Sequence, residues 1–282
     1  MSTSMKETFI HPTALVEPGV ELGQGVSVGP FCHVQSGAVI GDNSELMSHV
    51  VISDAVRLGA NAKVYPHAVL GCDPQNGKHK GGPTTLVVGD NCLVREGVTM
   101  NRGSDSSRGY TSVGNNCQFL AYAHVAHDCD VGDHVTFANN VMIGGHVEIG
   151  HHAILGGGSA VHQFTRVGHH AFVGGMAALA HDLIPYGSAI GNHAYLGGLN
   201  IIGMKRSGMQ RKDIHNLRHA VHMLFDRTKP VRERAQDVLK AIPDSDGVAD
   251  LISFILVENK RAYCTPPLGS SVGGAMDDGD DD

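Results

Sequence analysis

The sequence has no tryptophan, and only 5% of its 282 residues are aromatic. It also lacks an unbroken run of about 18 apolar residues, which a helix needs to cross a bilayer. The first residues, 1–4, lack the basic and then apolar character of a secretory signal peptide. These absences predict a cytoplasmic protein without membrane insertion.

Cysteine pairs and a strong charge bias are also missing. The six cysteines form no C-x-x-C pattern, which argues against a cysteine-held metal and for a reducing compartment. The formal net charge is −7, but five of the acidic residues lie within 277–282, so the rest of the chain is close to neutral. We therefore predict no nucleic-acid partner, no structural metal and no cofactor.

What the sequence does contain is a repeat of six residues. A large aliphatic or aromatic residue recurs at every sixth position from Ile10 to Leu70. The repeat is interrupted over 71–87 and again over 101–112, then restarts at Val113 and continues to Leu179. Internal repeats of this kind are typical of stacked, quasi-one-dimensional folds.

The composition of each hexapeptide predicts a short strand and a bend. Two positions before the large residue lies a small or apolar one, and a spacing of two places both side chains on one face of a strand. Glycine often follows the large residue and suits a tight turn. Stacked parallel strands would then share one continuous core. Four cysteines occupy the small inward position and are interpreted as packing residues: Cys32, Cys92, Cys117 and Cys129. Cys72 and Cys264 lie outside the repeat and are not assigned.

The repeat ends near Pro185 and gives way to helical spacing. Apolar residues over 214–225 share one helical face, Pro230 is placed to open a second helix, and Asp246 to cap a third. We expect this helical unit to close the end of the stacked coils. The predicted domains are a β-helical domain over 8–190, a connector and helical domain over 191–264, and a disordered acidic tail over 265–282.

Histidines gather at one corner of the predicted stack. In a coil of 18 residues, His127, Gly145 and Gln163 form one column, at about 4.8 Å per coil. His146 and His162 fall one residue to either side of this column on the next two coils. All of these histidines lie outside the inward positions, and so does His124, which is on the outward face of its strand. They are therefore candidates for a site, although surface histidines are common in this histidine-rich chain.

A histidine next to an acid is typical of general-base chemistry. Neutral His127 could take a proton while Asp128 fixes its tautomer and stabilises the cation that forms. The backbone N–H of Gly145 is unobstructed by a side chain and suits a developing oxyanion. These groups fit acyl transfer to an acceptor that the base deprotonates, without a covalent nucleophile.

Short segments distributed along the chain resemble one acyltransferase family. The sequence is similar to the acyl-carrier-protein–UDP-N-acetylglucosamine O-acyltransferases of lipid A biosynthesis, which are hexapeptide-repeat proteins. The resemblance covers about residues 8 to 260 and is specific because these segments occur in this order. Those that carry it include Ala123–Cys129, Gly145–Val147, Ala160–Phe164, Gly191–Ala194 and Gly198–Asn200.

The resemblance implies a mainly β fold, a left-handed parallel β-helix with a small C-terminal α-helical domain. It implies a homotrimer with clefts between subunits, and two substrates: acyl-carrier protein carrying a 3-hydroxyacyl chain, and a UDP-sugar. The reaction would transfer the (R)-3-hydroxyacyl group to the 3-position of UDP-N-acetylglucosamine, the first step of lipid A biosynthesis.

The resemblance also implies roles for individual residues. His127 would be the general base, Asp128 would orient it, and the Gly145 amide would hold the oxyanion. Lys78 would reach across from a neighbouring subunit, and Gly175 would leave room for the acyl chain. Of the remaining substrate-binding residues, some would line the sugar and acyl sites (His124, His146, His162 and Gln163) and two would face the UDP moiety (Asn200 and Arg206). His193 is also implied to bind substrate.

One departure from the family leaves the acceptor open. Relatives commonly carry Pro-Gln-Asp where this chain has Pro74-Gln75-Asn76. An amide at Asn76 is neutral and can also donate a hydrogen bond, which suits an alternative acceptor, a 3-amino sugar nucleotide that gives an amide product.

An alternative of another class is a zinc hydratase like the γ-class carbonic anhydrases, in which three imidazoles on a trimeric β-helix bind the metal.

Overall fold

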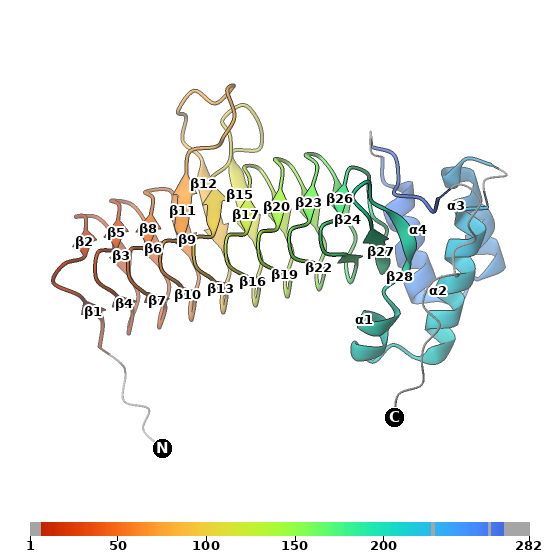
Figure 1. The fold of residues 1–282 in the computed structure, drawn as a ribbon, viewed down its shortest axis with the longest axis horizontal. Helices are drawn as coiled ribbons and strands as arrows, with labels where there is room; N and C mark the ends of the chain where they lie inside the picture. Colours follow the sequence, from red (N-terminus) through yellow and green to blue (C-terminus); the bar gives the residue numbers. More distant parts are fainter. Residues whose placement is uncertain (1–6, 227–228, 259–260, 268–282) are drawn as a thin grey trace, which may run out of the picture.

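The computed structural model describes residues 7–226, 229–258 and 261–267. Short parallel strands stack into a long three-sided prism, and four helices gather at its C-terminal end (Figure 1). Each coil of the chain visits three sheets in turn, so every strand inside a sheet is paired with the strands before and after it in the stack. We call these sheets A, B and C.

The strands are short, and most of them contain two residues. Sheet A contains β1 (Phe9–Ile10), β4 (Ser27–Val28), β7 (Glu45–Leu46), β10 (Lys63–Val64), β13 (Leu93–Val94), β16 (Gln118–Phe119), β19 (Thr136–Phe137), β22 (Ile154–Leu155), β25 (Phe172–Val173), β27 (Gly187–Ile190) and β28 (Tyr195–Leu199). Sheet B contains β2 (Leu15–Val16), β5 (His33–Val34), β8 (Val51–Ile52), β11 (Val69–Cys72), β14 (Thr99–Asn101), β17 (His124–Val125), β20 (Met142–Ile143), β23 (Ala160–Val161) and β26 (Ala178–Leu179). Sheet C contains β3 (Glu21–Leu22), β6 (Val39–Ile40), β9 (Val56–Leu58), β12 (Thr85–Val88), β15 (Tyr110–Val113), β18 (Asp130–Val131), β21 (Glu148–Ile149) and β24 (Arg166–Val167).

The strand register confirms the predicted coil length. Val125 pairs with Ile143, and Ile143 pairs with Val161, so one coil is 18 residues. The two interruptions of the repeat are insertions between sheets B and C. The strands on either side of them keep their parallel pairing, with one irregularity between Leu70 and Cys72 of β11. We call residues 73–84, between β11 and β12, the first loop, and residues 102–109, between β14 and β15, the second loop. Both project from the prism next to each other (Figure 1).

The inward positions form the predicted continuous core. From Val26 onward the small and the large residue of each hexapeptide are almost all buried, and the rings of Phe119 and Phe137 pack at 5.0 Å. The four cysteines assigned to inward positions are at most 1% exposed, which confirms that assignment. Of the two left unassigned, Cys264 is buried and Cys72 is exposed.

The corners explain much of the histidine content. Most corners place one residue in the left-handed region, which disfavours most side chains but tolerates asparagine, aspartate and histidine. At the corner between sheets C and A this column is Asn43, Asn61, Asn91, Asn116, His134, His152, His170 and Tyr186. At the corner between sheets B and C it includes Asp128, His146 and Phe164. Backbone geometry therefore selects histidine at several corners for structural reasons.

The C-terminal part is helical, with α1 (Ile201–Arg206), α2 (Arg211–Leu224), α3 (Val231–Ala241) and α4 (Asp246–Leu256). The predicted apolar face of α2 is buried. Two helix starts differ from the prediction: Pro230 is the N-cap of α3, one residue before the helix, and Ser245 is the N-cap of α4, so Asp246 lies in its first turn. The short helix α1 was not predicted, because the glycine-rich sequence around it masks helical spacing.

The last described residues close the stack. Tyr263 forms a parallel bridge with Asp182, which covers the last edge of sheet C. The boundary predicted at residue 190 falls at the end of β27, just before the antiparallel turn to β28. Of the predicted tail, residues 268–282 lie outside the described residues. None of the helices in the described ranges combines the length and the apolar character that a membrane crossing requires.

Candidate active site

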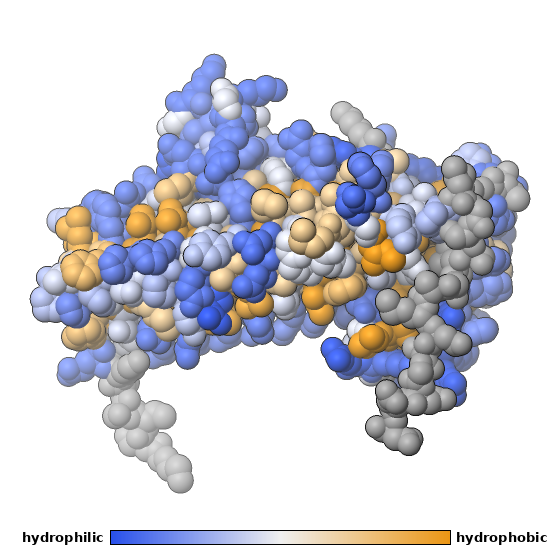
Figure 2. All heavy atoms as spheres, viewed as in Figure 1, coloured by the Kyte–Doolittle hydropathy of each residue, from blue (hydrophilic) through white to orange (hydrophobic). Residues whose placement is uncertain are grey.

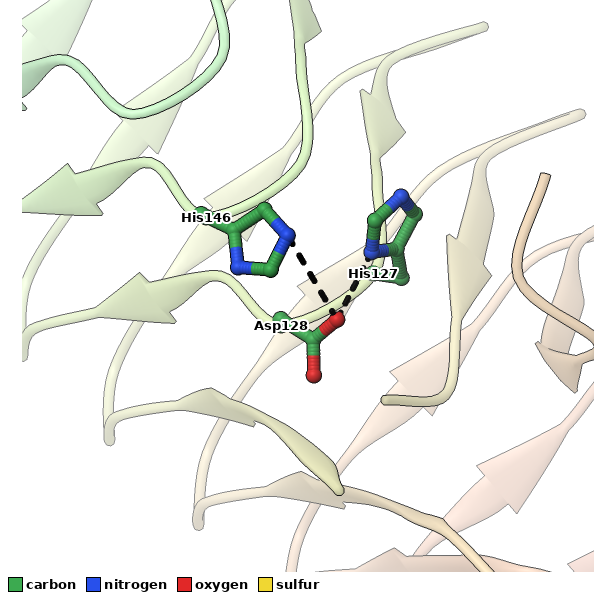
Figure 3. Close-up of side chains that lie close together, drawn as sticks. All are labelled: His127, Asp128 and His146. Atoms are coloured by element: carbon green, nitrogen blue, oxygen red, sulfur yellow. Dashed lines mark hydrogen bonds and ion pairs between the residues drawn. The ribbon is translucent and has the colours of Figure 1, made fainter. Parts of the chain in front are cut away.

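His127 and Asp128 occupy the turn between β17 and β18, at the corner of sheets B and C. The His127 Nδ1 atom lies 2.7 Å from the Asp128 Oδ2 atom (Figure 3). The Asp128 side chain is fully buried, and the His127 side chain is 12% exposed. Because a carboxylate only accepts, Nδ1 carries the hydrogen, which leaves the lone pair of the neutral ring on Nε2. One ring edge is therefore held by the acid while the other is free to take a proton.

Asp128 is fixed from two further directions. Its Oδ1 atom accepts the backbone N–H of Ser104 at 3.0 Å, and its own N–H donates to the Thr111 hydroxyl at 2.8 Å. Its φ of 59° is the left-handed value that this corner requires. Ser104 and Thr111 lie in the second interruption of the repeat, where sequence reasoning assigned no role to any residue. The only signal was that this polar insertion directly precedes the coil that carries His127.

His146 stands one coil from Asp128, in the same column of the corner. Its Nε2 atom is 3.9 Å from Asp128 Oδ2, and its ring is perpendicular to that of His127 at 5.1 Å (Figure 3). On its other side it stacks on Phe164 at 4.3 Å, and Ser107 Oγ lies 3.3 Å from its Nδ1. Burial lowers the pKa of His146, against the opposing effect of the Asp128 charge. Burial therefore favours the neutral form of His146.

His124 projects outward from β17 beside the pair. Its Nδ1 atom lies 2.7 Å from the Thr99 hydroxyl on the adjacent strand β14. Burial lowers the pKa of His124, and the nearby His127 lowers it further. The corner thus places two imidazoles, His127 and His146, against one buried carboxylate, with His124 beside them on β17.

Gly145 lies directly against the His127 ring. A Cβ atom added at Gly145 would be 2.7 Å from His127 Cε1 and 2.8 Å from His127 Nε2, so only glycine fits beside the ring as it is oriented here. The backbone N–H of Gly145 has no hydrogen-bond partner among the described residues. Gln163 follows on the next coil, where its backbone packs over Gly144. The predicted column of these residues is therefore present.

The first loop is linked to this corner through Asn76. The Asn76 Nδ2 atom donates to the Ser104 hydroxyl at 3.2 Å, and its Oδ1 accepts the backbone N–H of Lys78 at 3.0 Å. The Lys78 side chain is exposed. Further along the corner, His162 Nδ1 lies 2.8 Å from a guanidinium nitrogen of Arg261.

The other predicted substrate residues lie elsewhere on the chain. Gly175 is at the corner between sheets A and B, and His193 is exposed in the turn between β27 and β28. Asn200 caps α1: it accepts the Gly203 N–H and donates to the His170 carbonyl, both at 2.9 Å. Arg206 is exposed in the last turn of α1. One chain therefore does not bring these residues to the His127 corner.

The corner also has the donor set of a metal site. The ligand atoms of His127, Asp128 and His146 lie within 4.8 Å of one another. Two imidazoles and a carboxylate are a ligand set that zinc accepts. The chemistry of the residues alone thus permits base catalysis or metal binding.

Two family models match the chain. Residues 110–145 match the bacterial transferase hexapeptide model (six repeats), and residues 182–264 match a model described as UDP N-acetylglucosamine O-acyltransferase, domain 2. A left-handed parallel β-helix of hexapeptide repeats with a histidine–aspartate pair at one corner defines the class as a hexapeptide-repeat acyltransferase.

Similar proteins narrow this class to one family. Acyl-[acyl-carrier-protein]–UDP-N-acetylglucosamine O-acyltransferases of Brucella ovis and Brucella canis are 78% identical over 278 residues, which is 99% of this chain and 100% of theirs. The solved structure of LpxA from Acinetobacter baumannii matches with a TM-score of 0.88 at 34% identity, over 90% of this chain and 99% of that one. The UDP-N-acetylglucosamine acyltransferase of Arabidopsis matches with a TM-score of 0.78 at 30% identity, over 91% and 100%. The chain belongs to the acyl-[acyl-carrier-protein]–UDP-N-acetylglucosamine O-acyltransferase family.

Proposed function

We propose that this protein transfers an (R)-3-hydroxyacyl group from acyl-carrier protein to the 3-hydroxyl of UDP-N-acetylglucosamine, the first step of lipid A biosynthesis. The observation that carries the proposal is the His127–Asp128 pair, in which the buried carboxylate holds Nδ1 and leaves Nε2 free. The full-length similarity to relatives named for this reaction supports the choice of substrates.

The reaction needs one base and no covalent intermediate on the protein. His127 Nε2 takes the proton of the sugar 3-hydroxyl as its oxygen attacks the thioester carbonyl carbon. The carbonyl π bond opens to an oxyanion, which re-forms the carbonyl and expels the carrier thiolate. The thiolate then takes the proton from the imidazolium. Asp128 stabilises that cation without becoming protonated, because its charge is already compensated by its donors.

Gly145 supplies the donor for the oxyanion. Its unpaired N–H lies on the coil next to His127, and a side chain there would displace the imidazole. A preorganised N–H directed at the position where negative charge develops stabilises the transition state more than the ground state. His124, His146, His162 and Gln163 line the sugar and acyl sites around this corner.

The complete site is built between subunits of a homotrimer. Gly175, His193, Asn200 and Arg206 lie away from His127 in one chain, so their substrate roles require a neighbouring copy. The exposed Lys78 on the first loop reaches across to the site of a neighbouring subunit. Apolar patches on the prism support such an assembly (Figure 2), since isolated proteins rarely expose large apolar areas. Exposed large apolar side chains include Leu15, Phe31, Tyr122, Met142, Phe164 and Met176.

The acyl donor also indicates where the protein works. We place the enzyme in the cytoplasm, because acyl-carrier protein is its second partner and the six cysteines of the described ranges are free. The mechanism uses only side chains and backbone groups, and we propose no cofactor.

A 3-amino acceptor remains the second candidate, favoured by Asn76. Both atoms of the Asn76 amide are engaged within the loops, and Nδ2 acts as a donor there. An aspartate at this position could not donate, so the contact with the Ser104 hydroxyl would reverse its direction, with Ser104 as the donor. Steady-state assays with UDP-N-acetylglucosamine and its 3-amino analogue separate the two: a higher kcat/KM for the 3-amino compound identifies it as the acceptor.

The proposal is tested by His127→Ala assayed with 3-hydroxyacyl-carrier proteins of several chain lengths. Loss of the base lowers kcat by about 10²–10⁴-fold. The control is His151→Ala, which removes a histidine at the same position of its hexapeptide, next to Asp133, at another corner. We expect the control to keep full activity, and a His127→Ala enzyme with normal turnover would refute the proposal.

A further inference from the structure

Ser104 joins three parts of the molecule at one buried point. Its side chain is in the second loop and is fully buried. Its N–H donates to Asp128 Oδ1 at 3.0 Å, while its hydroxyl oxygen accepts the Asn76 Nδ2–H at 3.2 Å and contacts Ser106 Oγ at 2.7 Å. Ser104 therefore binds two partners: its backbone N–H holds the Asp128 carboxylate, and its hydroxyl holds the first loop through Asn76.

The Asp128 carboxylate depends on this contact. It is fully buried, and its two oxygens receive one hydrogen bond each from described groups near it, His127 Nδ1–H on Oδ2 and Ser104 N–H on Oδ1. A buried carboxylate oxygen that loses its donor is strongly destabilised. If the Ser104 N–H moved away, the carboxylate would rotate toward another donor, and the His127 ring would lose its orientation.

The position of the Ser104 N–H is set by the Ser104 side chain. Its hydroxyl accepts the backbone N–H of Ser106 at 3.3 Å, and its carbonyl accepts that of Ser107 at 3.0 Å, which together form the turn at the start of the second loop. The bond from Asn76 attaches this turn to the first loop. A separate tie between the loops runs through the Asp105 carboxylate, which accepts the N–H groups of Lys80 and Gly82 and makes no contact with Asp128.

We propose that Ser104 is a positioning residue that couples the first loop to the His127–Asp128 pair. The inference rests on the proposed function, in which the first loop contacts the acceptor sugar through Asn76. When the acceptor fixes this loop, Asn76 fixes Ser104, and the Ser104 N–H fixes the carboxylate that orients the base. Acceptor binding energy is then used to set the base, which raises kcat instead of lowering KM.

The test is a double-mutant cycle between Ser104 and Asp128. We expect Ser104→Ala to lower kcat by about 3- to 10-fold, which corresponds to the loss of one hydrogen bond that orients the carboxylate. KM for either substrate should change less than about twofold. Ser104→Thr, which keeps the hydroxyl, restores kcat. In an Asp128→Ala background, Ser104→Ala causes no further loss, because the carboxylate through which it acts is gone. The matched control is Ser112→Ala, because the Ser112 hydroxyl donates to Asp130 and not to Asp128. We expect this variant to keep full activity.

The outcomes separate this inference from the function itself. Equal losses from Ser104→Ala with and without Asp128, or a loss confined to KM, would overturn the coupling even if His127→Ala is inactive. Normal activity of His127→Ala would instead remove the proposed function. If Ser104→Ala fails to fold by circular dichroism, Asn76→Ala replaces it in the cycle. That variant removes the donor to the Ser104 hydroxyl together with the acceptor of the Lys78 N–H, so KM for the acceptor rises as well, and the same non-additivity is expected in kcat.

Discussion

Substituting Gly145 by alanine tests the catalytic corner most directly, because it changes the position of His127 without changing either catalytic side chain. The added Cβ would lie 2.7 Å from His127 Cε1 and 2.8 Å from Nε2. Non-bonded carbon atoms approach to about 3.5 Å, so the ring must retreat by about 1 Å. The only alternative is a shift of the Gly145 backbone, which is fixed in the stack because its carbonyl accepts the Phe164 N–H at 3.0 Å.

A displacement of this size has a large effect on rate. The hydrogen bond from His127 Nδ1 to Asp128 Oδ2 is already short, at 2.7 Å. Moving the ring therefore either lengthens this bond or turns Nε2 away from the acceptor sugar. A misplacement of about 1 Å costs about 10²-fold in rate. Alanine keeps the backbone N–H, so the oxyanion donor is retained and the loss reports the position of the base.

The assay compares kcat of Gly145→Ala and of a matched control with one 3-hydroxyacyl-carrier protein and UDP-N-acetylglucosamine. The control is Gly157→Ala, at the same position of its hexapeptide, where the added Cβ would have its nearest neighbour at 3.5 Å, the Asn139 carbonyl oxygen. We expect Gly157→Ala to keep its activity and both variants to unfold cooperatively. A Gly145→Ala enzyme with kcat within threefold (about 0.7 kcal/mol) of the wild type would refute the assignment of His127 as the base.

Three further predictions concern the acid, the acid stability and the metal alternative. Asp128→Asn replaces the acceptor of the His127 Nδ1–H by an amide that can donate, so we expect kcat to fall by about 10²-fold or more with a folded protein by circular dichroism. Burial lowers the pKa of His170 from 6.5 to about 4, helped by His169 and His152, so stability is complete above pH 6.5 and declines as the pH falls toward 4. Asparagine occupies this corner in four earlier coils. In His170→Asn, the free energy of unfolding from urea titrations should therefore fall less between pH 7.5 and 5, by about 1–2 kcal/mol after allowance for solvent screening. Metal analysis of purified protein, with activity after chelation, should give no stoichiometric zinc and no loss of turnover, whereas zinc-dependent hydration of carbon dioxide would favour the hydratase.

The hexapeptide repeat made the architecture predictable to the level of single side chains. Because one face of each strand is buried, the phase of the repeat fixes which residues point inward, and the four inward cysteines are buried as expected. The same phase placed His127, Gly145 and His146 at one corner on successive coils, where the structure has them in contact. A periodic backbone turns sequence separation directly into distance, so these local predictions hold.

The insertions and the helix caps were not predictable in the same way. Ser104 has no repeat phase, and its contact with Asp128 depends on how the second loop folds back on the corner. Likewise, the engagement of the Asn200 side chain in the start of α1 could not be read from its glycine-rich surroundings. In both cases a short polar segment is positioned by long-range hydrogen bonds.

The sequence by itself determined the coil, the core and the corner at which the histidines meet, since a period of six has only one way to bury its apolar face. The tertiary structure alone decided which donors hold the Asp128 carboxylate and therefore which nitrogen of His127 is free. It also decided that Gly175, Asn200 and Arg206 lie apart from that corner in a single chain. The physical reason is that apolar burial is set by local pattern, whereas the orientation of a buried charge depends on every polar group that reaches it.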